Sequence, residues 1–408
     1  MKPIVVIGAG QAGASLVAKL RQLGHSDGLI LIGDEPRPPY QRPPLSKGYL
    51  LGDMSVEQLL LRPQSFYADQ NIELWSGKRV EAIDPLAKTV KIDGQIVEYH
   101  QLALTTGSVP RRLPSPANAS GVYTVRNLAD VDAMAKEFQA GRRVLIVGGG
   151  YIGLEAAAVA AKLGLEVTLI EMAPRILQRV AAPETAAFFR KLHEGHGVRI
   201  LEGVGLERLV EDGGRVTGAL LSNGQNLSVD FVIAGVGIAP ATGLAEAAGL
   251  RVENGIWTDV HGRTSDPAVW AAGDGASFPW NDGRLRLESV GHAIDHAECV
   301  ASNMLGIEKP YIPKPWFWSD QYDVKLQIAG LNQGYDSVVI RQGAGEQRSI
   351  WYYRGEQLLA VDAINDPRSF MVARRILEAG QTVERSLVQD VNIDVKQLLA
   401  AATRTCDA

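Results

Sequence analysis

The sequence predicts an α/β fold that contains two separate parallel-sheet units and ends in an α+β domain. A short apolar strand, a GxGxxG turn and a helix-forming segment follow one another in PIVVIGAGQAGA, at 3–14. The same order recurs in RVLIVGGGYIGLEAA, at 143–157. Beyond residue 313, short alternating segments separated by glycine-containing turns indicate antiparallel strands instead. Together these three observations define the fold class.

The first unit begins close to the N-terminus. Ile4–Ile7 reads as a buried parallel strand, and Ala14–Leu23 has the composition of a helix. A second strand, Leu29–Ile32, is followed by the acidic residues Asp34 and Glu35. The glycines of the turn between the first strand and the helix are Gly8, Gly10 and Gly13.

The second unit repeats this order. Val144–Val147 is the expected strand, Leu154–Leu163 the helix, and Val167–Ile170 a second strand that leads into Glu171. The glycines of this turn are Gly148, Gly150 and Gly153.

Two matched copies of the turn indicate two bound dinucleotides. The first glycine allows the tight turn, the second lets the backbone approach a pyrophosphate, and the third permits close helix packing. The helix N-terminus stabilises the phosphate charge, and an acid about twenty residues further on can accept a hydrogen bond from a ribose hydroxyl. One copy alone would be read as a plain strand-to-helix turn. Two copies in two Rossmann-like units favour a flavin and a nicotinamide cofactor.

Two later strands also end in glycine, in FVIAGVGIAPAT at 231–242 and in VWAAGDGAS at 269–277. Asp274, between Gly273 and Gly275, has the position of a residue that accepts hydrogen bonds from a ribityl or ribose hydroxyl. An aspartate in an ordinary turn fits the local sequence equally well.

Composition narrows the class of protein. The 408 residues are 46% hydrophobic and 21% charged, enough for two or three globular domains. A net charge of −5 gives no general basic field for nucleic acid or an anionic membrane. Cys299 and Cys406 are the only cysteines, so no disulfide framework or thiolate metal cluster is expected. The first apolar run is too short for a signal peptide or a membrane span, and a cytoplasmic protein is expected.

A set of motifs in fixed order resembles one known family, the FAD-dependent NADH:ferredoxin reductases of bacterial cytochrome P450 and ring-hydroxylating dioxygenase systems. The glycine turns, GVGIAP and AAGDGA are shared by many two-dinucleotide flavoproteins. YQRPPLSK at 40–47 and PWFWSDQY at 315–322 are more specific to this branch and its apoptosis-inducing-factor relatives. LTTGSVPR at 104–111 stands where such proteins usually carry ATG. The likeness covers nearly the whole chain.

The resemblance implies a glutathione reductase-like fold with FAD on the first turn and NADH on the second. The position equivalent to Glu171 in the first unit is Gly33, so either Asp34 or Glu35 must reach the FAD ribose, and we favour Glu35. A helix beginning near Ser289 and Val290 would point its N-terminus at the flavin, and His292 is read as a histidine in its first turn. The other cofactor-binding positions implied are Gly8, Gly10, Gly13, Arg42, Lys47, Thr106, Gly107, Arg111, Gly148, Gly150, Gly153, Glu155, Glu171, Gly237, Gly273, Asp274 and Trp318.

Three of these residues are also implied in the chemistry. In the family, the positions of Lys47 and Glu155 form an ion pair beside flavin N5, where a cation stabilises charge that accumulates on the ring. Trp318 would stack over the flavin and nicotinamide, whereas Trp316 is read as core. Without the resemblance, Lys47 would be a solvated loop lysine and Glu155 a glutamate favoured by the helix dipole.

Glu171 predicts NADH rather than NADPH. A 2′-phosphate about 4 Å from its carboxylate would cost roughly 4 kcal/mol at an effective dielectric constant near 20. The loss of one ribose hydrogen bond costs only about 1 kcal/mol. Arg175, four residues later, is an alternative phosphate partner.

The implied electron acceptor is an acidic [2Fe-2S] ferredoxin that docks transiently. The segment QRPPLSKGYLLGD, at 41–53, holds no cysteine where disulfide reductases of this fold carry their redox-active pair, so electrons must leave the flavin directly. Arg62, Lys309 and Lys314 are candidates for a basic docking patch, although solvated side chains are an equal reading. A monomer without metal is expected. Rubredoxin reductase, monodehydroascorbate reductase and a redox-sensing protein like apoptosis-inducing factor remain alternatives.

Four segments are expected along the chain. An FAD-binding domain spans 1–112 and continues at 241–312, an NADH-binding domain spans 113–240, and a C-terminal domain spans 313–408. Proline-rich stretches at 110–116 and 310–315 mark two of the boundaries. Within the last domain, strands are expected in KLQIAGL, SVVIRQ, SIWYYRG and QLLAVDAI, followed by a helix near Phe370–Ala379.

Overall fold

The computed structural model describes residues 2–113 and 120–404. The chain forms two compact units. Unit 1 comprises Met1–Arg42, Ser55–Val109 and Ile238–Lys314, and unit 2 comprises Pro43–Met54, Pro110–Gly237 and Pro315–Ala408. Part of the proline-rich stretch at 110–116 lies outside the described residues.

Unit 1 is built on a five-stranded parallel sheet in the order β19-β7-β1-β2-β3. Its strands are β1 (Ile4–Ile7), β2 (Leu29–Ile32), β3 (Glu73–Trp75), β7 (Gln101–Leu104) and β19 (Val269–Ala271). β1 and β2 are buried throughout, as their unbroken apolar sequences require in a sheet covered on both faces.

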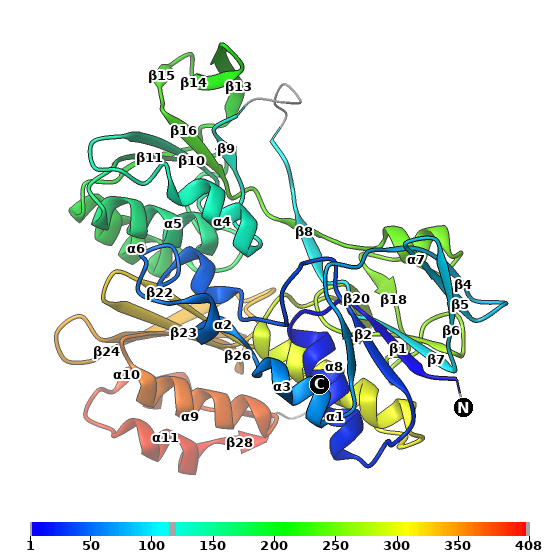
Figure 1. Cartoon of the computed structure of the whole chain (residues 1–408). Helices are drawn as coiled ribbons and strands as arrows, with labels where there is room; N and C mark the ends of the chain where they lie inside the picture. Colours follow the sequence, from blue (N-terminus) through cyan, green and yellow to red (C-terminus); the bar gives the residue numbers. More distant parts are fainter. Residues whose placement is uncertain (1, 114–119, 405–408) are drawn as a thin grey trace. The chain divides into compact units, whose positions relative to one another are not determined.

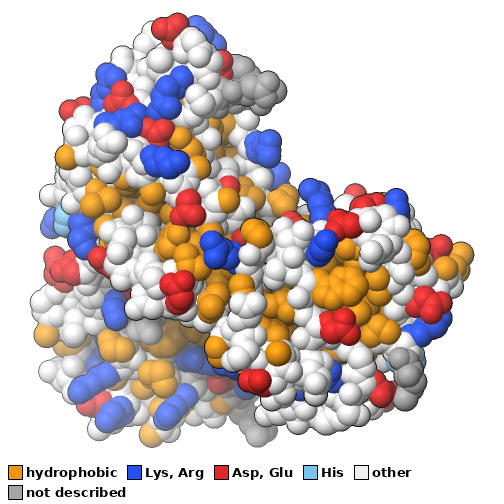
Figure 2. All heavy atoms as spheres, in the orientation of Figure 1, with side chains coloured by type: hydrophobic (Ala, Val, Ile, Leu, Met, Phe, Trp, Pro, Cys, Tyr) orange, Lys and Arg blue, Asp and Glu red, His pale blue; other side chains and the backbone are white. Residues whose placement is uncertain are grey.

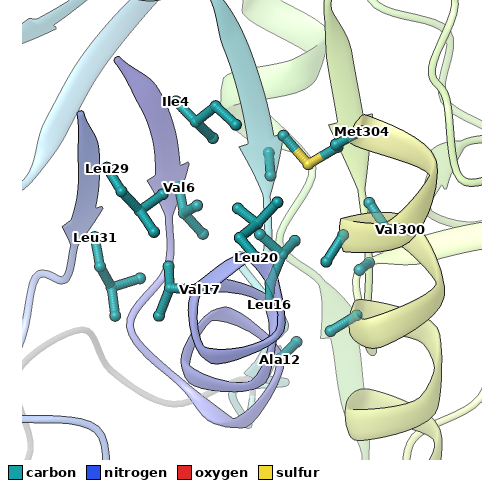
Figure 3. Packing of buried hydrophobic residues seen from close by; sticks show 14 of the residues in the cluster. Ile4, Val6, Ala12, Leu16, Val17, Leu20, Leu29, Leu31, Val300 and Met304 are labelled. Carbon is teal, nitrogen blue, oxygen red and sulfur yellow. The ribbon is translucent and has the colours of Figure 1, made fainter. Parts of the chain in front are cut away.

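Helices α1 (Gln11–Gln22) and α8 (Val290–Met304) pack on one face of this sheet (Figure 3). Leu16, Val17 and Leu20 of α1 project into the same buried cluster as Val300 and Met304 of α8. A second cluster, built around Val5, Ile7 and Leu102, covers the other face. The remaining elements are α2 (Val56–Leu59), α3 (Gln64–Asp69), β4 (Val80–Asp84), β5 (Thr89–Ile92), β6 (Gln95–Glu98), β8 (Ser108–Pro110), β17 (Ile238–Pro240), α7 (Gly243–Ala247), β18 (Ile256–Trp257), β20 (Ala276–Trp280) and β21 (Gly283–Leu285).

Unit 2 contains a second five-stranded parallel sheet, in the order β12-β11-β10-β16-β9 (Figure 1). These strands are β9 (Val122–Tyr123), β10 (Arg143–Val147), β11 (Glu166–Glu171), β12 (Arg199–Glu202) and β16 (Phe231–Ala234). Three helices belong to this part, α4 (Leu128–Ala135), α5 (Tyr151–Lys162) and α6 (Pro183–Gly195). A small antiparallel sheet joins β13 (Leu206–Asp212), β14 (Arg215–Leu221) and β15 (Asn226–Ser228).

The C-terminal part of unit 2 is an antiparallel sheet in the order β22-β23-β26-β25-β24. Its strands are β22 (Trp316–Gln321), β23 (Val324–Gly330), β24 (Ser337–Gln342), β25 (Arg348–Arg354) and β26 (Gln357–Ile364). Four of them match the strands expected from sequence, and β22 adds a fifth at the edge. The remaining elements are η1 (Pro43–Ser46), α9 (Pro367–Glu378), β27 (Gln381–Thr382), α10 (Arg385–Gln389), α11 (Val395–Ala401) and β28 (Thr403–Arg404).

Both glycine-turn helices begin earlier than the sequence predicts. The expected starts were Ala14 and Leu154, whereas α1 begins at Gln11 and α5 at Tyr151. In each case the second glycine of the turn is the helix N-cap, and the third lies inside the first turn of the helix. The third glycine lowers the helix propensity of the first turn, so a prediction from composition places the helix start too late. That glycine is required by close packing rather than by helix propensity.

No helix among residues 2–113 and 120–404 is long and apolar enough to cross a membrane. Within the same residues, no cluster of three or more His, Cys, Asp or Glu side chains is arranged to hold a metal ion.

Candidate functional site

The first glycine turn leaves space at its middle glycine. A Cβ atom on Gly8, whose φ is +110°, would lie 2.3 Å from the Thr105 carbonyl oxygen, and one on Gly13 would lie 2.1 Å from that of Gly8. A Cβ atom on Gly10 would meet no atom within 4 Å. Gly10 is also the N-cap of α1, where backbone N–H groups are free to bind an anion. The turn fits the pyrophosphate of a dinucleotide.

The second turn repeats this arrangement in unit 2. Cβ atoms on Gly148 and Gly153 would lie 2.4 Å from the Gly235 carbonyl oxygen and 2.1 Å from that of Gly148. One on Gly150, the N-cap of α5, would again meet nothing within 4 Å. In both turns, packing within the protein explains the outer glycines but not the middle one. The space beside the middle glycine therefore fits a ligand, as the two-dinucleotide prediction requires.

The acidic residues after β2 have different surroundings. Glu35 is half-buried, forms a 2.5 Å ion pair with Arg42, and accepts a hydrogen bond from the Tyr40 hydroxyl. Asp34 is exposed. A Cβ atom on Gly33 would lie 2.6 Å from that of Ala9, so close packing explains why no acid stands at this position. The contacts of Glu35 with Arg42 favour it over Asp34 as the ribose ligand, which remains a prediction.

Glu171 lies at the end of β11 and faces the second glycine turn. Its carboxylate accepts hydrogen bonds from the backbone N–H groups of Gly149, at 2.7 Å, and Ala173, at 2.8 Å. Arg175 is engaged elsewhere, because its guanidinium group donates to the carbonyl oxygens of Gln178 and Ala181. The alternative role of Arg175 as a phosphate partner would break these bonds.

Further predicted cofactor-binding residues lie at the ends of strands in unit 1. Thr106 donates a 2.8 Å hydrogen bond to the Ala241 carbonyl oxygen, and Gly107 follows it with a φ of +67°. Gly273 has a φ of +78°, and a Cβ atom there would lie 2.8 Å from that of Ala12 in α1. The half-buried Asp274 follows it, and its carbonyl oxygen accepts a bond from Arg286.

The remaining predicted positions are fixed by hydrogen bonds that involve main-chain groups. Ser289 is the N-cap of α8, accepting a hydrogen bond from the His292 N–H group, and Val290 is the first helical residue. In unit 2, the Arg111 N–H group donates to the carbonyl oxygen of Gly237, whose φ is +93°.

His292 has a structural environment, as expected for a histidine in the first turn of a packed helix. Its side chain is buried, and Nδ1 lies 2.8 Å from the Tyr311 hydroxyl. Burial lowers the pKa of His292 to about 4, so the ring is neutral at physiological pH.

Lys47 and Glu155 meet in unit 2. The Lys47 ammonium lies 2.8 Å from Oε2 of Glu155, whose side chain is 4% exposed. Two hydroxyl groups complete the coordination of the carboxylate. Ser46 donates to Oε2 at 2.6 Å, and Ser319 of β22 donates to Oε1 at 2.7 Å. Sequence reasoning did not find these serines, since a serine that bonds a residue more than a hundred positions away carries no local signal.

Trp318 is on β22, one residue before Ser319. Its side chain is half-buried and stacks on that of Trp316, with ring centroids 5.4 Å apart and an interplanar angle of 22°. Trp316 is itself only partly buried and packs against the small cluster of Ala329, Ala363 and Phe370.

Two glycine turns with room for dinucleotides are the pattern of a two-dinucleotide oxidoreductase. The family model for pyridine nucleotide-disulphide oxidoreductases matches residues 2–297, and that for the reductase C-terminal domain matches residues 316–399. The chain belongs to this oxidoreductase family, in the branch of the ferredoxin reductases.

Three relatives illustrate the similarity. The ferredoxin reductase subunit of 5,5'-dehydrodivanillate O-demethylase from Sphingobium sp. (strain NBRC 103272 / SYK-6) is 41% identical, over 97% of this chain and 98% of its own. The crystal structure of the ferredoxin reductase for the CYP199A2 system from Rhodopseudomonas palustris matches with a TM-score of 0.95, at 39% identity, over 98% and 100% of the two chains. Putidaredoxin reductase, crystallised in a covalent complex with putidaredoxin, matches with a TM-score of 0.94, at 38% identity, over 98% of each chain.

These matches confirm the predicted fold class, the FAD and NAD(H) cofactors and the enzyme class of a ferredoxin reductase. The predicted domain boundaries and the roles of individual residues stay predictions.

Proposed function

We propose that this chain takes hydride from NADH onto FAD and passes single electrons to a [2Fe-2S] ferredoxin, which supplies a cytochrome P450 or a ring-hydroxylating oxygenase. The observation that carries the proposal is the paired glycine turns, each with open space at the middle glycine only, in a chain of the ferredoxin reductase branch. FAD, when bound, supplies the conversion of a two-electron hydride into two single electrons.

The chain's own residues bind and distinguish the two dinucleotides. The N-terminus of α1 binds the FAD pyrophosphate, and Glu35, fixed by Arg42, accepts a hydrogen bond from the ribose. The N-terminus of α5 binds the pyrophosphate of NADH. Glu171 accepts from the adenosine ribose and repels a 2′-phosphate, which makes NADH the preferred donor.

Lys47 supplies positive charge where the reacting ring system gains electrons. Its ammonium is the only cation within bonding distance of the Glu155 carboxylate among the described residues, and it is 18% exposed. Such partial burial strengthens its field relative to water. Glu155 holds the lysine in place, and Trp318 provides a flat ring that excludes water from the nicotinamide side.

The partner is an acidic ferredoxin recognised by local basic residues. Arg62, Lys309 and Lys314 are exposed in unit 1, and Arg62 lies over the ring of Phe66 with its guanidinium carbon 5.6 Å from the centroid. The putidaredoxin complex of one relative supports a ferredoxin acceptor. We place the enzyme in the cytoplasm as a monomer, where NADH is available, and it needs neither a membrane nor a nucleic acid.

The test is an anaerobic reaction of the FAD-loaded protein with NADH, followed by addition of a [2Fe-2S] ferredoxin from the same organism. Flavin absorbance should bleach rapidly and recover only when the oxidised ferredoxin is added. Recovery with rubredoxin or monodehydroascorbate, but not with ferredoxin, would assign one of those acceptors instead. Bleaching without recovery by any acceptor would favour a redox-sensing role.

A further inference from the structure

A chain of buried hydrogen bonds extends from the Lys47–Glu155 pair through unit 2. Ser319 Oγ donates to Glu155 at 2.7 Å and lies 3.1 Å from Nε2 of Gln321. Oε1 of Gln321 lies 2.7 Å from Nε2 of His193, and Nδ1 of His193 lies 3.2 Å from the Tyr322 hydroxyl. The chain connects α5, β22 and α6.

The inner members of this chain are sealed from water. Ser319, Gln321 and His193 are each 0% exposed. Alternation along β22 places Ser319 and Gln321 on one face of the strand, opposite to Trp318. A buried polar group that loses its partner has no water to replace it, so each bond constrains the next.

The carboxylate at one end fixes the direction of every bond. Glu155 only accepts, so the Ser319 hydroxyl must donate to it and is left to accept from the Gln321 amide N–H. Oε1 of Gln321 then accepts, which requires His193 to carry its proton on Nε2. Nδ1 of His193 accepts in turn from Tyr322. Burial lowers the pKa of His193 to about 4, in agreement with this neutral ring.

We infer that Gln321 and His193 are positioning residues, which lock the Ser319 hydroxyl onto Glu155 and thereby hold the carboxylate against Lys47. The inference rests on the proposed role of the Lys47–Glu155 pair in flavin reduction. Neither residue touches Lys47 or the carboxylate itself. Both act through Ser319, whose hydroxyl would otherwise be free to rotate.

The outer end of the chain is also anchored. The rings of His196 and Tyr322 stack with centroids 3.7 Å apart and an interplanar angle of 13°. Tyr322 has a φ of +57°, as the first residue of the two-residue turn that joins β22 to β23. This anchoring keeps the Tyr322 hydroxyl directed at His193.

The first experiment compares Gln321→Met with the matched variant Gln357→Met, which changes an exposed glutamine on β26 of the same sheet. The rate constant for flavin reduction by saturating NADH, measured by anaerobic stopped flow, should fall about fivefold in Gln321→Met, with the NADH dissociation constant within about twofold of wild type. Gln357→Met should match wild type in both. Equal rate constants in all three proteins would overturn the inference.

Glu155→Gln separates this inference from the proposed function. If Glu155→Gln reduces flavin at the wild-type rate, the proposed role of the pair is wrong, and the inference fails with it. If Glu155→Gln is slow while Gln321→Met behaves as wild type, only the inference fails.

Gln321→Glu gives a signature that loss of packing alone would not produce. The protonated carboxyl can donate to Ser319 and accept from His193 as the amide does, so the chain of hydrogen bonds survives at low pH. The ionised carboxylate only accepts, and it draws the Ser319 hydroxyl away from Glu155. The reduction rate relative to wild type should therefore be close to one at low pH and fall about tenfold as the introduced group ionises.

Other titratable groups lie around this chain of hydrogen bonds. They are His193 on α6, His196 directly after that helix, Glu155 on α5, Lys47 after η1, and Asp362 on β26, which bonds Thr185 of α6. Dividing the reduction rate of Gln321→Glu by that of wild type at each pH removes the pH effects that these groups have on both proteins. A ratio that does not change with pH would contradict the inference even if the variant is less stable.

The direction of the chain can be tested without turnover. In ¹⁵N-histidine-labelled wild-type protein, His193 should appear as a neutral ring protonated at Nε2. His193→Gln identifies the signal by its loss. A proton on Nδ1 would reverse the chain, leave the Ser319 hydroxyl unfixed, and overturn the inference.

Discussion

At the scale of single residues, the buried Glu155 carboxylate requires a cation and hydrogen-bond donors around it. A carboxylate that is 4% exposed must be paired and hydrogen-bonded, because removal of one partner from a buried pair costs about 3–5 kcal/mol. Lys47, Ser46 and Ser319 satisfy it together. The same contacts that stabilise the fold thus hold the lysine in one place, as its proposed electrostatic role requires.

Replacement of Lys47 by methionine should therefore slow flavin reduction more than it weakens NADH binding. The charge that Lys47 supplies is needed most as electrons reach the flavin, so we expect the reduction rate constant to fall about a hundredfold. Stopped-flow absorbance over a range of NADH concentrations separates the rate constant from the dissociation constant. An unchanged rate constant would remove Lys47 from the chemistry.

Replacement of Glu171 by arginine should move cofactor preference toward NADPH. The variant removes a repulsion of roughly 4 kcal/mol and adds an attraction to the 2′-phosphate. The ratio of kcat/KM for NADH and NADPH measures the shift. Arg175→Ala is the control, and it should keep the wild-type preference, since Arg175 bonds the carbonyl oxygens of its own loop. A changed preference in Arg175→Ala alone would assign specificity to that residue.

Sequence reasoning reached the charged pair of this site but not the neutral residues that hydrogen-bond to it directly or in series. The pairing of Lys47 with Glu155 came from a family resemblance, since the two residues are 108 positions apart by their numbers. No role was predicted for four hydrogen-bonding residues, Ser46, Ser319, Gln321 and His193. Their importance comes from burial and from the direction of their hydrogen bonds, and neither has a pattern in the sequence.

At the scale of elements, the two glycine-turn helices show how packing and ligand binding divide the glycines. The bounds of β1 and β2 followed from apolar runs, whereas β10 begins one residue earlier than predicted and β11 extends one residue further at each end. The helix starts were missed, because glycines that serve close packing look like helix breakers. β22 was missed as a strand, since its sequence WFWSDQ does not alternate in polarity.

Because one glycine of the turn serves packing and another faces the ligand space, two alanine substitutions in this turn should have different effects. Gly153→Ala would put a Cβ atom 2.1 Å from a backbone oxygen, so the protein without nucleotide should unfold at a lower temperature. Gly150→Ala meets nothing within 4 Å and has a φ of −81°, so its unfolding temperature should be unchanged. Its methyl group would occupy the space for the pyrophosphate and weaken NADH binding at least about tenfold. Wild-type NADH affinity in Gly150→Ala would disprove this placement of the cofactor.

Asp362 links β26 to α6 and makes stability depend on pH. It is 0% exposed, accepts bonds from Tyr352 and Thr185, and burial raises its pKa to about 6. Because the folded pKa exceeds the ordinary 3.8, its contribution to stability is complete below about pH 4 and is lost as pH rises through about 6. The gap corresponds to about 3 kcal/mol.

Asp362→Asn should remove this dependence, because the amide stays neutral. Its free energy of unfolding, measured by urea denaturation relative to wild type, should increase from about pH 4 to about pH 7 and then level off. The trend with pH carries the test, since Oδ1 of Asp362 has no partner and the absolute value includes burial of the new amide. Asp323→Asn, at an exposed position, should show no such trend. Parallel curves for Asp362→Asn and wild type would contradict the raised pKa.

At the scale of the whole molecule, the chain contributes three separate segments to each compact unit. The short segment Pro43–Met54 clusters with unit 2, although the residues on either side of it in sequence belong to unit 1. Its bonds from Ser46 and Lys47 to Glu155 explain this membership. The sequence allows long contiguous segments to be assigned to a domain. A twelve-residue segment that joins the other unit is determined by side-chain contacts, which only a structure reveals.

Charge distribution governs how the whole enzyme meets an acidic partner. The protein has a net charge of −5, and on the face shown in Figure 2 basic and acidic side chains are interspersed over most of the surface. Association with an acidic ferredoxin must then depend on a local basic area, whose field is screened within about 8 Å at physiological ionic strength. Arg62, exposed in unit 1, is the residue that we expect to contribute most.

Ferredoxin-dependent turnover should therefore lose kcat/KM as salt concentration rises, while flavin reduction by NADH stays constant. Arg62→Glu should lower kcat/KM for ferredoxin about tenfold at low salt and flatten the salt dependence, because the attraction that salt screens has been removed. Arg208→Glu, an exposed site on β13, changes the net charge by the same amount and should have a much smaller effect. Equal losses in the two variants would mean that total charge, rather than a basic area around Arg62, controls association. A salt-independent wild-type rate would mean that docking is apolar.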